Sequence, residues 1–331
     1  MKEIEEACIV GPGRMGIGIA TALMAGDTEL KLILLDIKDR DPARKTERLE
    51  QARSEILRNL RLLKELGELQ DDPEDLMGRL LITRDAAETG DCGIVFEALP
   101  ERPELKQEFL RKTERLFDPS AIIASATSTI HLKTFHEAAR RPERIVIAHW
   151  LNPAFIIPLV EVATGKTTAP WAAEGILRFL SRAGKIPVAL KDSAGFIVPR
   201  IQVAAMNEAV RIIEEGVATP ETVDTAIKAG FGFRLAVMGL IEFIDLGGLD
   251  ILYHASRYLF KELGLDQYRP LSSIENKMNR NEVGPRSGKG FYEYTGVDTE
   301  TLFLNRYKGF LELLKLVRGS EFLDFKGGIN R

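Results

Sequence analysis

The sequence predicts an α/β domain followed by an all-helical domain, and three observations lead to this prediction. Short apolar runs rich in Ile, Val and Leu alternate with longer helical patterns in the first half of the chain, which is typical of parallel βαβ units. Beyond residue 192 only helical periodicity remains, with Thr219 as the expected N-cap and Pro220 as the first helical residue. The length of 331 residues suits two domains better than one.

The apolar runs of the first half predict strands of one sheet. They are Ala7 to Val10, Lys31 to Leu35, Ile94 to Glu97, Ile122 to Ser125, Ile145 to His149 and Leu159 to Val162. Residues 41–69 form a long charged stretch with Leu49, Ile56, Leu60 and Leu63 at helical spacing, and this stretch predicts an inserted helical arm. We therefore expect domains at 1–192 and 193–331.

Composition excludes several classes of function. The 45 basic and 49 acidic side chains give a net charge of -4, which provides no general attraction for nucleic acid or an anionic membrane. Two cysteines, Cys8 and Cys92, are too few for a disulfide framework and indicate a reducing compartment, with the cytoplasm as the expected location. The start MKEIEEA lacks the basic and apolar character of a signal peptide, and no apolar run approaches the roughly 18 residues of a membrane span. We expect no metal site.

The segment GPGRMG predicts a dinucleotide-binding turn. It follows the apolar run ACIV and opens a helix of small residues. Gly11 permits the tight turn, Gly13 lets a pyrophosphate approach the backbone, and Gly16 lets the helix pack against the sheet. The phosphates then meet the helix N-terminus at Arg14 and Met15. The first domain is therefore predicted to be a Rossmann domain, with the arm at residues 41–69 inserted in it.

The run LKLILLD ends in Asp36, twenty residues after Gly16. A carboxylate there can accept hydrogen bonds from the adenosine ribose and repels a 2'-phosphate, which favours NAD over NADP. Lys38 and Arg40 weaken this preference without reversing it. The alternative is a glycine turn and a strand-ending acid that bind no ligand.

His149 is the one histidine of four that stands at the end of an apolar run, where ligands bind in open α/β sheets. Pro153 and Pro158 break the chain before the next run, so a reversal would bring Glu161 back beside His149. An imidazole oriented by a carboxylate is a good general base. The alternative is a structural histidine and a glutamate that pairs elsewhere.

Four motifs, GPGRMGIGIA, HWLNP followed by LVEV, DSAGFIV and SGKGFYEY, together resemble the 3-hydroxyacyl-CoA dehydrogenase family over residues 5–295. The resemblance implies an NAD-dependent enzyme of fatty acid metabolism in which a histidine removes the hydroxyl proton while hydride leaves the same carbon. It puts the catalytic dyad at His149 and Glu161 and further active-site groups at Ser128 and Asn152. A homodimer joined through the helical domain is also expected.

The same resemblance puts an acid and a lysine that lie near the cofactor and the acyl chain at Glu101 and Lys106. The alternative for Lys106 is a solvated helix lysine. On the arm, basic residues could hold the phosphates of coenzyme A, and the alternative is an amphipathic helix with a solvated face. These residues are Arg44, Lys45, Arg48, Arg53, Arg58 and Lys64.

Three departures from the family pattern leave the substrate open. Pro199 stands where members have an asparagine, Ala126 where an asparagine is common, and Pro158 where acyl-CoA members often carry a lysine. Such changes resemble the branches that act on small hydroxy acids, such as gulonate, carnitine and pyridine-alcohol dehydrogenases. The expected substrate is an acyl-CoA, with a free small hydroxy acid or other secondary alcohol as the alternative. An NAD-binding structural protein without turnover, suggested by crystallin relatives, is the alternative of another class. The tail after Tyr294 is expected to pack on the helical domain or across a dimer.

Overall fold

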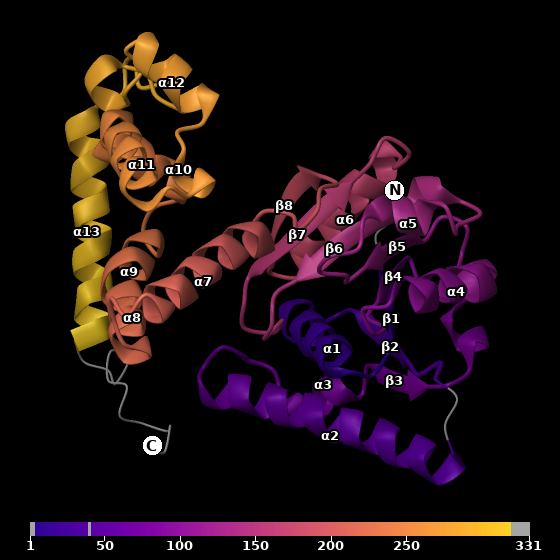
Figure 1. The fold of residues 1–331 in the computed structure, drawn as a ribbon. Coiled ribbons are helices and arrows are strands. Elements are labelled where there is room, and N and C mark those ends of the chain that lie inside the picture. The colour runs from indigo at the N-terminus through magenta and orange to yellow at the C-terminus, as the bar shows by residue number, and fades with distance from the viewer. Residues whose placement is uncertain (1–3, 39–40, 319–331) are drawn as a thin grey trace. The chain divides into compact units, whose positions relative to one another are not determined.

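The computed structural model describes residues 4–38 and 41–318, and at residues 42–45 the backbone alone (Figure 1). Contacts divide the chain into two units, Met1–Ala204 and Ala205–Arg331. The first unit is built on a sheet and the second is helical, as the sequence predicts. Each unit is described by itself.

The described part of the first unit forms an eight-stranded sheet in the order β3-β2-β1-β4-β5-β6-β7-β8. Neighbouring strands are parallel except for β6 and β7, which pair antiparallel. The carboxyl ends of β1, β2, β4, β5 and β6 therefore lie at one edge of the sheet. The strands are β1 (Glu6–Val10), β2 (Lys31–Leu35), β3 (Leu80–Thr83), β4 (Ile94–Glu97), β5 (Ile122–Ser125), β6 (Ile145–Trp150), β7 (Leu159–Thr164) and β8 (Ile186–Lys191).

The six strands expected from the apolar runs are present, but the expectation missed β3 and β8. Both lie at the outer edges of the sheet, where one side of a strand has no neighbour. Leu81 and Ile186 are exposed there, and Pro187 stands in β8, as proline can in an edge strand. Edge strands therefore carry a weaker apolar signal than the central strands, which are buried on both faces.

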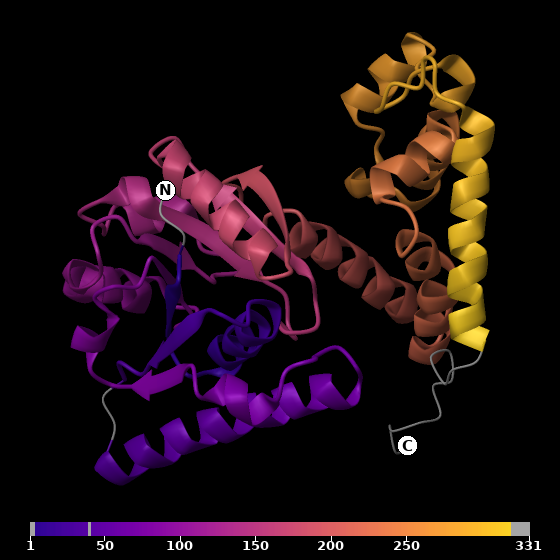
Figure 2. The same ribbon diagram turned by 180° about the vertical axis from the view of Figure 1, so that it is seen from behind.

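Helices cover both faces of this sheet. Alternate residues of β1 point to opposite faces, so Ile9 packs in the core beneath α1 and α6, and Val10 in the core beneath α4 and α5. Figure 2 shows α6 lying over the strands of the second half of the sheet. The helices are α1 (Arg14–Gly26), α2 (Pro42–Glu65), α3 (Pro73–Met77), α4 (Pro103–Thr113), α5 (Leu132–His136) and α6 (Pro170–Arg182).

The inserted arm is a single helix, α2, which packs against α1, α3 and β3 (Figure 1). Its apolar stripe is buried through Ala52, Ile56, Leu60 and Leu63, whereas Leu49 is half-buried. The helical spacing of apolar residues that predicted an arm therefore corresponds to the face of α2 that packs against the rest of the first unit.

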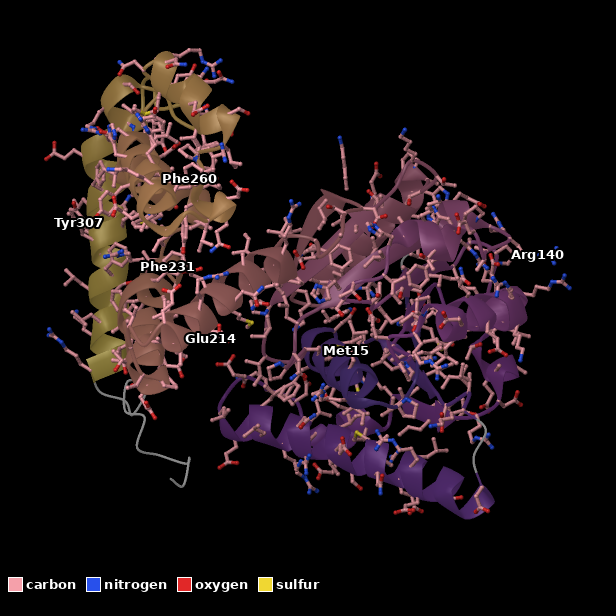
Figure 3. All side chains as sticks on the ribbon, viewed as in Figure 1. Met15, Arg140, Glu214, Phe231, Phe260 and Tyr307 are labelled. Carbon is pink, nitrogen blue, oxygen red and sulfur yellow. The ribbon has the colours of Figure 1, made fainter. Side chains whose placement is uncertain are left out.

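Helix α7 (Val198–Glu214) begins in the first unit and continues into the second. Thr219 caps α8 by accepting a hydrogen bond from the backbone N–H of Thr222, as predicted. Figure 3 labels Phe260 on α11 and Tyr307 on α13. The helices are α8 (Pro220–Ala226), a π-helical turn (Ile227–Phe231), α9 (Gly232–Leu235), α10 (Leu240–Gly247), α11 (Leu249–Leu263), α12 (Ser272–Asn279) and α13 (Thr299–Arg318).

The motif SGKGFYEY forms a loop that packs against α10 of this unit. The buried carboxylate of Asp245 accepts hydrogen bonds from the backbone N–H groups of Phe291 and Tyr292 and from the hydroxyl of Tyr294. A Cβ at Gly290 would lie 2.4 Å from a carboxylate oxygen of Asp245. The loop can therefore close on α10 only with glycine at this position.

The described part of the tail after Tyr294 forms α13 (Thr299–Arg318) and packs on its own helical unit. Phe310 stacks on Phe233 with ring centroids 5.9 Å apart, and Arg306 pairs with Glu242 at 2.7 Å. These contacts favour the first of the two expected placements of the tail.

None of the helices described is both long and apolar enough to span a membrane. Within the described residues, no group of three or more His, Cys, Asp or Glu side chains is arranged to hold a metal ion.

Candidate active site

The glycine turn between β1 and α1 has the geometry of a phosphate-binding loop. Gly11 has a φ of +105°, and a Cβ there would lie 2.9 Å from the carbonyl oxygen of Ala98. A Cβ at Gly16 would lie 2.0 Å from the carbonyl oxygen of Gly11, so this glycine allows α1 to pack against the turn. Gly13, in contrast, would direct a Cβ into open space.

That open space fits a dinucleotide pyrophosphate. Gly13 is the N-cap of α1 and provides no capping side chain, and the first turn of α1 holds no acidic residue. The first N–H groups of α1 and its positive dipole end are therefore available to an anion. The residues present fit NAD, and Gly13, Arg14 and Met15 would hold its phosphates.

Asp36 directly follows β2 at the same edge of the sheet. Its side chain is buried, with 2% of the residue exposed, and its Oδ1 accepts a hydrogen bond from the N–H of Lys38 at 3.1 Å. Asp36 lines the same cavity as Gly11 and Gly13, which is where the adenosine ribose of NAD would lie.

His149 and Glu161 form a buried pair. The antiparallel register sets His149 opposite Glu161, and His149 Nδ1 lies 2.8 Å from Glu161 Oε2. The other oxygen, Oε1, accepts hydrogen bonds from the N–H groups of Ile197 and Val198, both at 2.9 Å. Since the carboxylate holds Nδ1, Nε2 is the imidazole nitrogen left to act on a ligand.

Lys185 stabilises the turn that joins β6 to β7. Its ammonium donates to the carbonyl oxygens of Ala154 at 2.8 Å and Ile157 at 3.2 Å, and it lies 5.7 Å from the centroid of the Trp150 ring. Burial holds the pKa of Lys185 below its ordinary value. The turn carries Asn152, so these contacts help to define where its amide lies.

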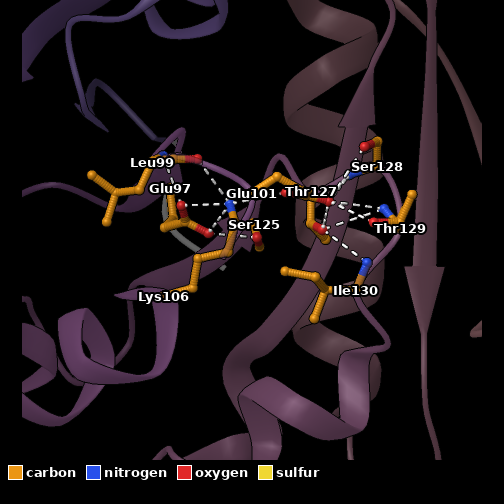
Figure 4. Close-up of polar contacts among 9 residues, drawn as sticks. All are labelled: Glu97, Leu99, Glu101, Lys106, Ser125, Thr127, Ser128, Thr129 and Ile130. Atoms are coloured by element: carbon orange, nitrogen blue, oxygen red, sulfur yellow. Dashed lines mark hydrogen bonds and ion pairs between the residues drawn. The ribbon is translucent and has the colours of Figure 1, made fainter. Parts of the chain in front are cut away.

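Glu101 organises the turn that carries Ser128 (Figure 4). Its Oε1 accepts hydrogen bonds from the hydroxyl of Thr127 at 2.6 Å and from the backbone N–H groups of Ser128 at 2.9 Å and Thr129 at 3.0 Å. Burial by itself raises the pKa of Glu101, but these donors and the charge of Lys106 outweigh it and hold the pKa below its ordinary value. Glu101 is therefore an ionised anchor for the turn.

Lys106 is buried beside Glu101. Its ammonium contacts both carboxylate oxygens of Glu97, at 2.8 and 3.0 Å, and lies 3.6 Å from Glu101 Oε2 (Figure 4). Ser125 donates to the same Glu97 carboxylate at 2.6 Å. The alternative of a solvated helix lysine is therefore wrong. Sequence reasoning missed Glu97 and Ser125, since polar residues at the ends of apolar runs give no sign of which partner they meet.

One cavity of about 730 Å³ unites most of the predicted site residues. Gly16, Lys106 and Glu161 do not line it and instead contact residues that do, namely Gly11, Glu101 and His149 respectively. The predicted residues that line it are Gly11, Gly13, Arg14, Met15, Asp36, Glu101, Ser128, His149 and Asn152. Figure 3 labels Met15, near the start of α1. Pro199 and Gln202 of α7 also line the cavity, and sequence reasoning did not select Gln202.

The arm contributes one contact to this region. Arg48 of α2 donates to the carbonyl oxygen of Pro12 and lies 3.6 Å from Glu55. Lys64 donates to the carbonyl oxygen of Gln70. Arg53 and Arg58 are exposed and have no ion pair within the described part of the chain. The side chains of Arg44 and Lys45 lie outside the described residues.

A Rossmann domain with this glycine turn, followed by a helical domain, defines an NAD-dependent dehydrogenase. The family pattern described as "3-hydroxyacyl-CoA dehydrogenase, NAD binding domain" matches residues 6–193, and "3-hydroxyacyl-CoA dehydrogenase, C-terminal domain" matches residues 195–294. The chain belongs to the 3-hydroxyacyl-CoA dehydrogenase family, and NAD is its cofactor.

Individual relatives span almost the whole chain. A probable 3-hydroxybutyryl-CoA dehydrogenase from Deinococcus radiodurans is 32% identical over 86% of this chain and 99% of its own. The 5-formyl-3-hydroxy-2-methylpyridine 4-carboxylate 5-dehydrogenase of Mesorhizobium japonicum is 32% identical over 96% of this chain and 100% of its own. The crystal structure of a 3-hydroxyacyl-CoA dehydrogenase from Archaeoglobus fulgidus is 31% identical, with a TM-score of 0.75 over 95% of this chain and 100% of that chain.

Proposed function

We propose that this dehydrogenase interconverts a 3-hydroxyacyl-CoA and its 3-ketoacyl-CoA, with His149 as general base. The observation that carries the proposal is the buried contact of 2.8 Å between His149 Nδ1 and Glu161 Oε2, because His149 lines the same cavity as the glycine turn. Glu161 fixes the tautomer in which Nδ1 carries the proton and Nε2 accepts one, and it stabilises the imidazolium that forms.

The reaction balances with two transfers, a proton from the hydroxyl oxygen and a hydride from the carbon that bears it. The hydroxyl proton of the substrate goes to Nε2 of His149, and the hydrogen on the same carbon leaves with its electron pair as hydride. NAD, when bound, supplies the acceptor of that hydride. The carbon is left as a ketone.

Ser128 and Asn152 bind the substrate oxygen in this proposal. Both line the cavity with His149, and each side chain can donate and accept a hydrogen bond. Glu101 holds the Ser128 turn, and Lys106 supports Glu101 from behind. Gly11, Gly13, Gly16, Arg14, Met15 and Asp36 form the NAD subsite.

A second candidate is the same chemistry on a free small hydroxy acid. Pro199 lines the cavity and contributes no hydrogen-bond donor, which departs from the acyl-CoA members. The Mesorhizobium japonicum relative, named for a pyridine carboxylate, matches along its whole length. These two observations favour this candidate over other alcohols.

A homodimer joined through the helical unit is part of the proposal. Several large apolar side chains of this unit are exposed, and an apolar surface of this kind is typical of a protein interface. They include Val217, Ile251, Tyr258, Leu311 and Leu316. Light scattering coupled to gel filtration measures the oligomeric state directly.

NADH oxidation separates the two candidate substrates. The purified chain is assayed with acetoacetyl-CoA and with free acetoacetate, beside the variant His149→Gln. Turnover of acetoacetyl-CoA that is lost in His149→Gln supports the proposal. Turnover of the free acid alone would favour the second candidate, and an unimpaired His149→Gln would remove the assigned base.

A further inference from the structure

The first turn of α7 forms one wall of the cavity. Pro199 and Gln202 both line it, and because they are three residues apart on a helix they share one face. Pro199 offers no donor to a ligand. Gln202, one turn later, has an amide that can donate two hydrogen bonds and accept two.

The amide of Gln202 is not committed to the fold. The residue is exposed, and its side chain makes no hydrogen bond with any part of the chain that the structure describes. His149 and Ser128, in contrast, already contact Glu161 and Glu101 respectively. Gln202 can therefore meet a ligand without first losing an internal partner, which would cost free energy.

The charges of the cavity are distributed unevenly. Its ionic side chains come from the glycine turn, from the end of β2 and from the loop after β4, namely Arg14, Asp36, Lys38 and Glu101. The lining residues from β6, from the turn after it and from α7 include no Lys, Arg, Asp or Glu. A carboxylate is best recognised by Arg or Lys, whereas an amide suits a neutral carbonyl.

We infer that Gln202 is a specificity-determining residue whose side-chain amide donates a hydrogen bond to the neutral thioester carbonyl oxygen of the substrate. This contact orients the acyl chain so that the hydroxyl-bearing carbon, two carbons along, faces His149. The inference rests on the proposed function and narrows its substrate class to acyl thioesters.

The test compares two variants of Gln202 with a matched control. Gln202→Leu removes the amide at similar size, and Gln202→Lys replaces it with a cation suited to a carboxylate. Asn207→Leu is the control, because Asn207 is an exposed amide of the same helix that does not line the cavity. Steady-state rates are measured with NADH and either acetoacetyl-CoA or free acetoacetate, together with the dissociation constant of NADH.

We expect Gln202→Leu to lower kcat/KM for acetoacetyl-CoA about tenfold, mainly through KM, since the contact exists in both the bound and the transition state. NADH affinity should change less than about twofold. Gln202→Lys should raise the preference for free acetoacetate over acetoacetyl-CoA about tenfold or more, as a cation pairs with the carboxylate. Asn207→Leu should behave as the wild type.

Three results would overturn the inference. An unchanged kcat/KM in Gln202→Leu, while His149→Gln still abolishes turnover, would refute it and leave the proposed function standing. An equal loss in Asn207→Leu would identify an effect on the helix instead of a substrate contact. A wild type that reduces only free acetoacetate, with Gln202→Leu impaired on it, would show a carboxylate contact in place of the thioester carbonyl.

Discussion

His149 and Glu161 face each other across the antiparallel pair β6 and β7, with Nδ1 2.8 Å from Oε2 and both side chains buried. The hydrogen bonds from Ile197 and Val198 to the second oxygen of Glu161 fix the carboxylate from the other side. The contact with Glu161 therefore orients the imidazole so that Nε2 is the ring nitrogen turned away from the carboxylate.

The first prediction concerns the pair of His149 and Glu161. His149→Gln should lower kcat about a hundredfold or more, because general-base catalysis is lost, while the dissociation constant of NAD stays nearly unchanged. Glu161→Gln should also lower kcat, since the charge that stabilises the imidazolium is gone. His254→Gln, at an exposed histidine of the second unit, is the control, and a wild-type kcat in His149→Gln contradicts the assignment.

The second prediction concerns the choice between NAD and NADP. Asp36→Ala should weaken NAD binding and relax discrimination against NADP, because the ribose contact and the repulsion of a 2'-phosphate are both lost. The ratio of kcat/KM for the two cofactors measures this effect. A wild type that prefers NADP would rule out the assigned role of Asp36.

The third prediction concerns the inserted arm, helix α2. Arg53 and Arg58 are the exposed guanidinium groups of α2 that have no ion pair in the described residues. Replacing both with Gln should raise KM for acetoacetyl-CoA severalfold with kcat little altered, as expected for lost uniform binding to coenzyme A phosphates. Arg178→Gln on α6 is the control. If acyl-CoA kinetics respond neither to the double change nor to ionic strength, the arm is a solvated helix.

The Glu101 carboxylate makes the fourth prediction, on stability and pH. The pKa of Glu101 in the folded chain lies below its ordinary value of 4.5, so its contribution to stability is present above that value and is lost as pH falls through the lower, folded pKa. Glu101→Gln should therefore lower the urea midpoint at pH 7 and make the midpoint less sensitive to acid below about pH 4.5. Glu104→Gln, at an exposed acid of α4, should do neither. Parallel acid profiles for Glu101→Gln and the wild type would refute the prediction.

Much of the site could be predicted because its signals are local. The glycine turn depends on residues that follow one another in the chain, because Gly11 has a φ of +105° and a Cβ at Gly16 would meet the carbonyl oxygen of Gly11. The two prolines after His149 predict a reversal, and a reversal would bring the next strand back beside the first. The central strands could be predicted from continuous apolar runs because both of their faces are buried.

The sequence by itself therefore determined the central strands and the cofactor turn, whereas it left the pairing of His149 with Glu161 as one of two alternatives. Only the tertiary structure decided that β3 and β8 close the sheet edges, that Lys106 turns inward to Glu97, and that Gln202 faces the cavity. The reason is physical. A local pattern reports backbone conformation and the burial of one face, whereas the partner of a polar side chain depends on which distant segments packing brings within hydrogen-bond distance.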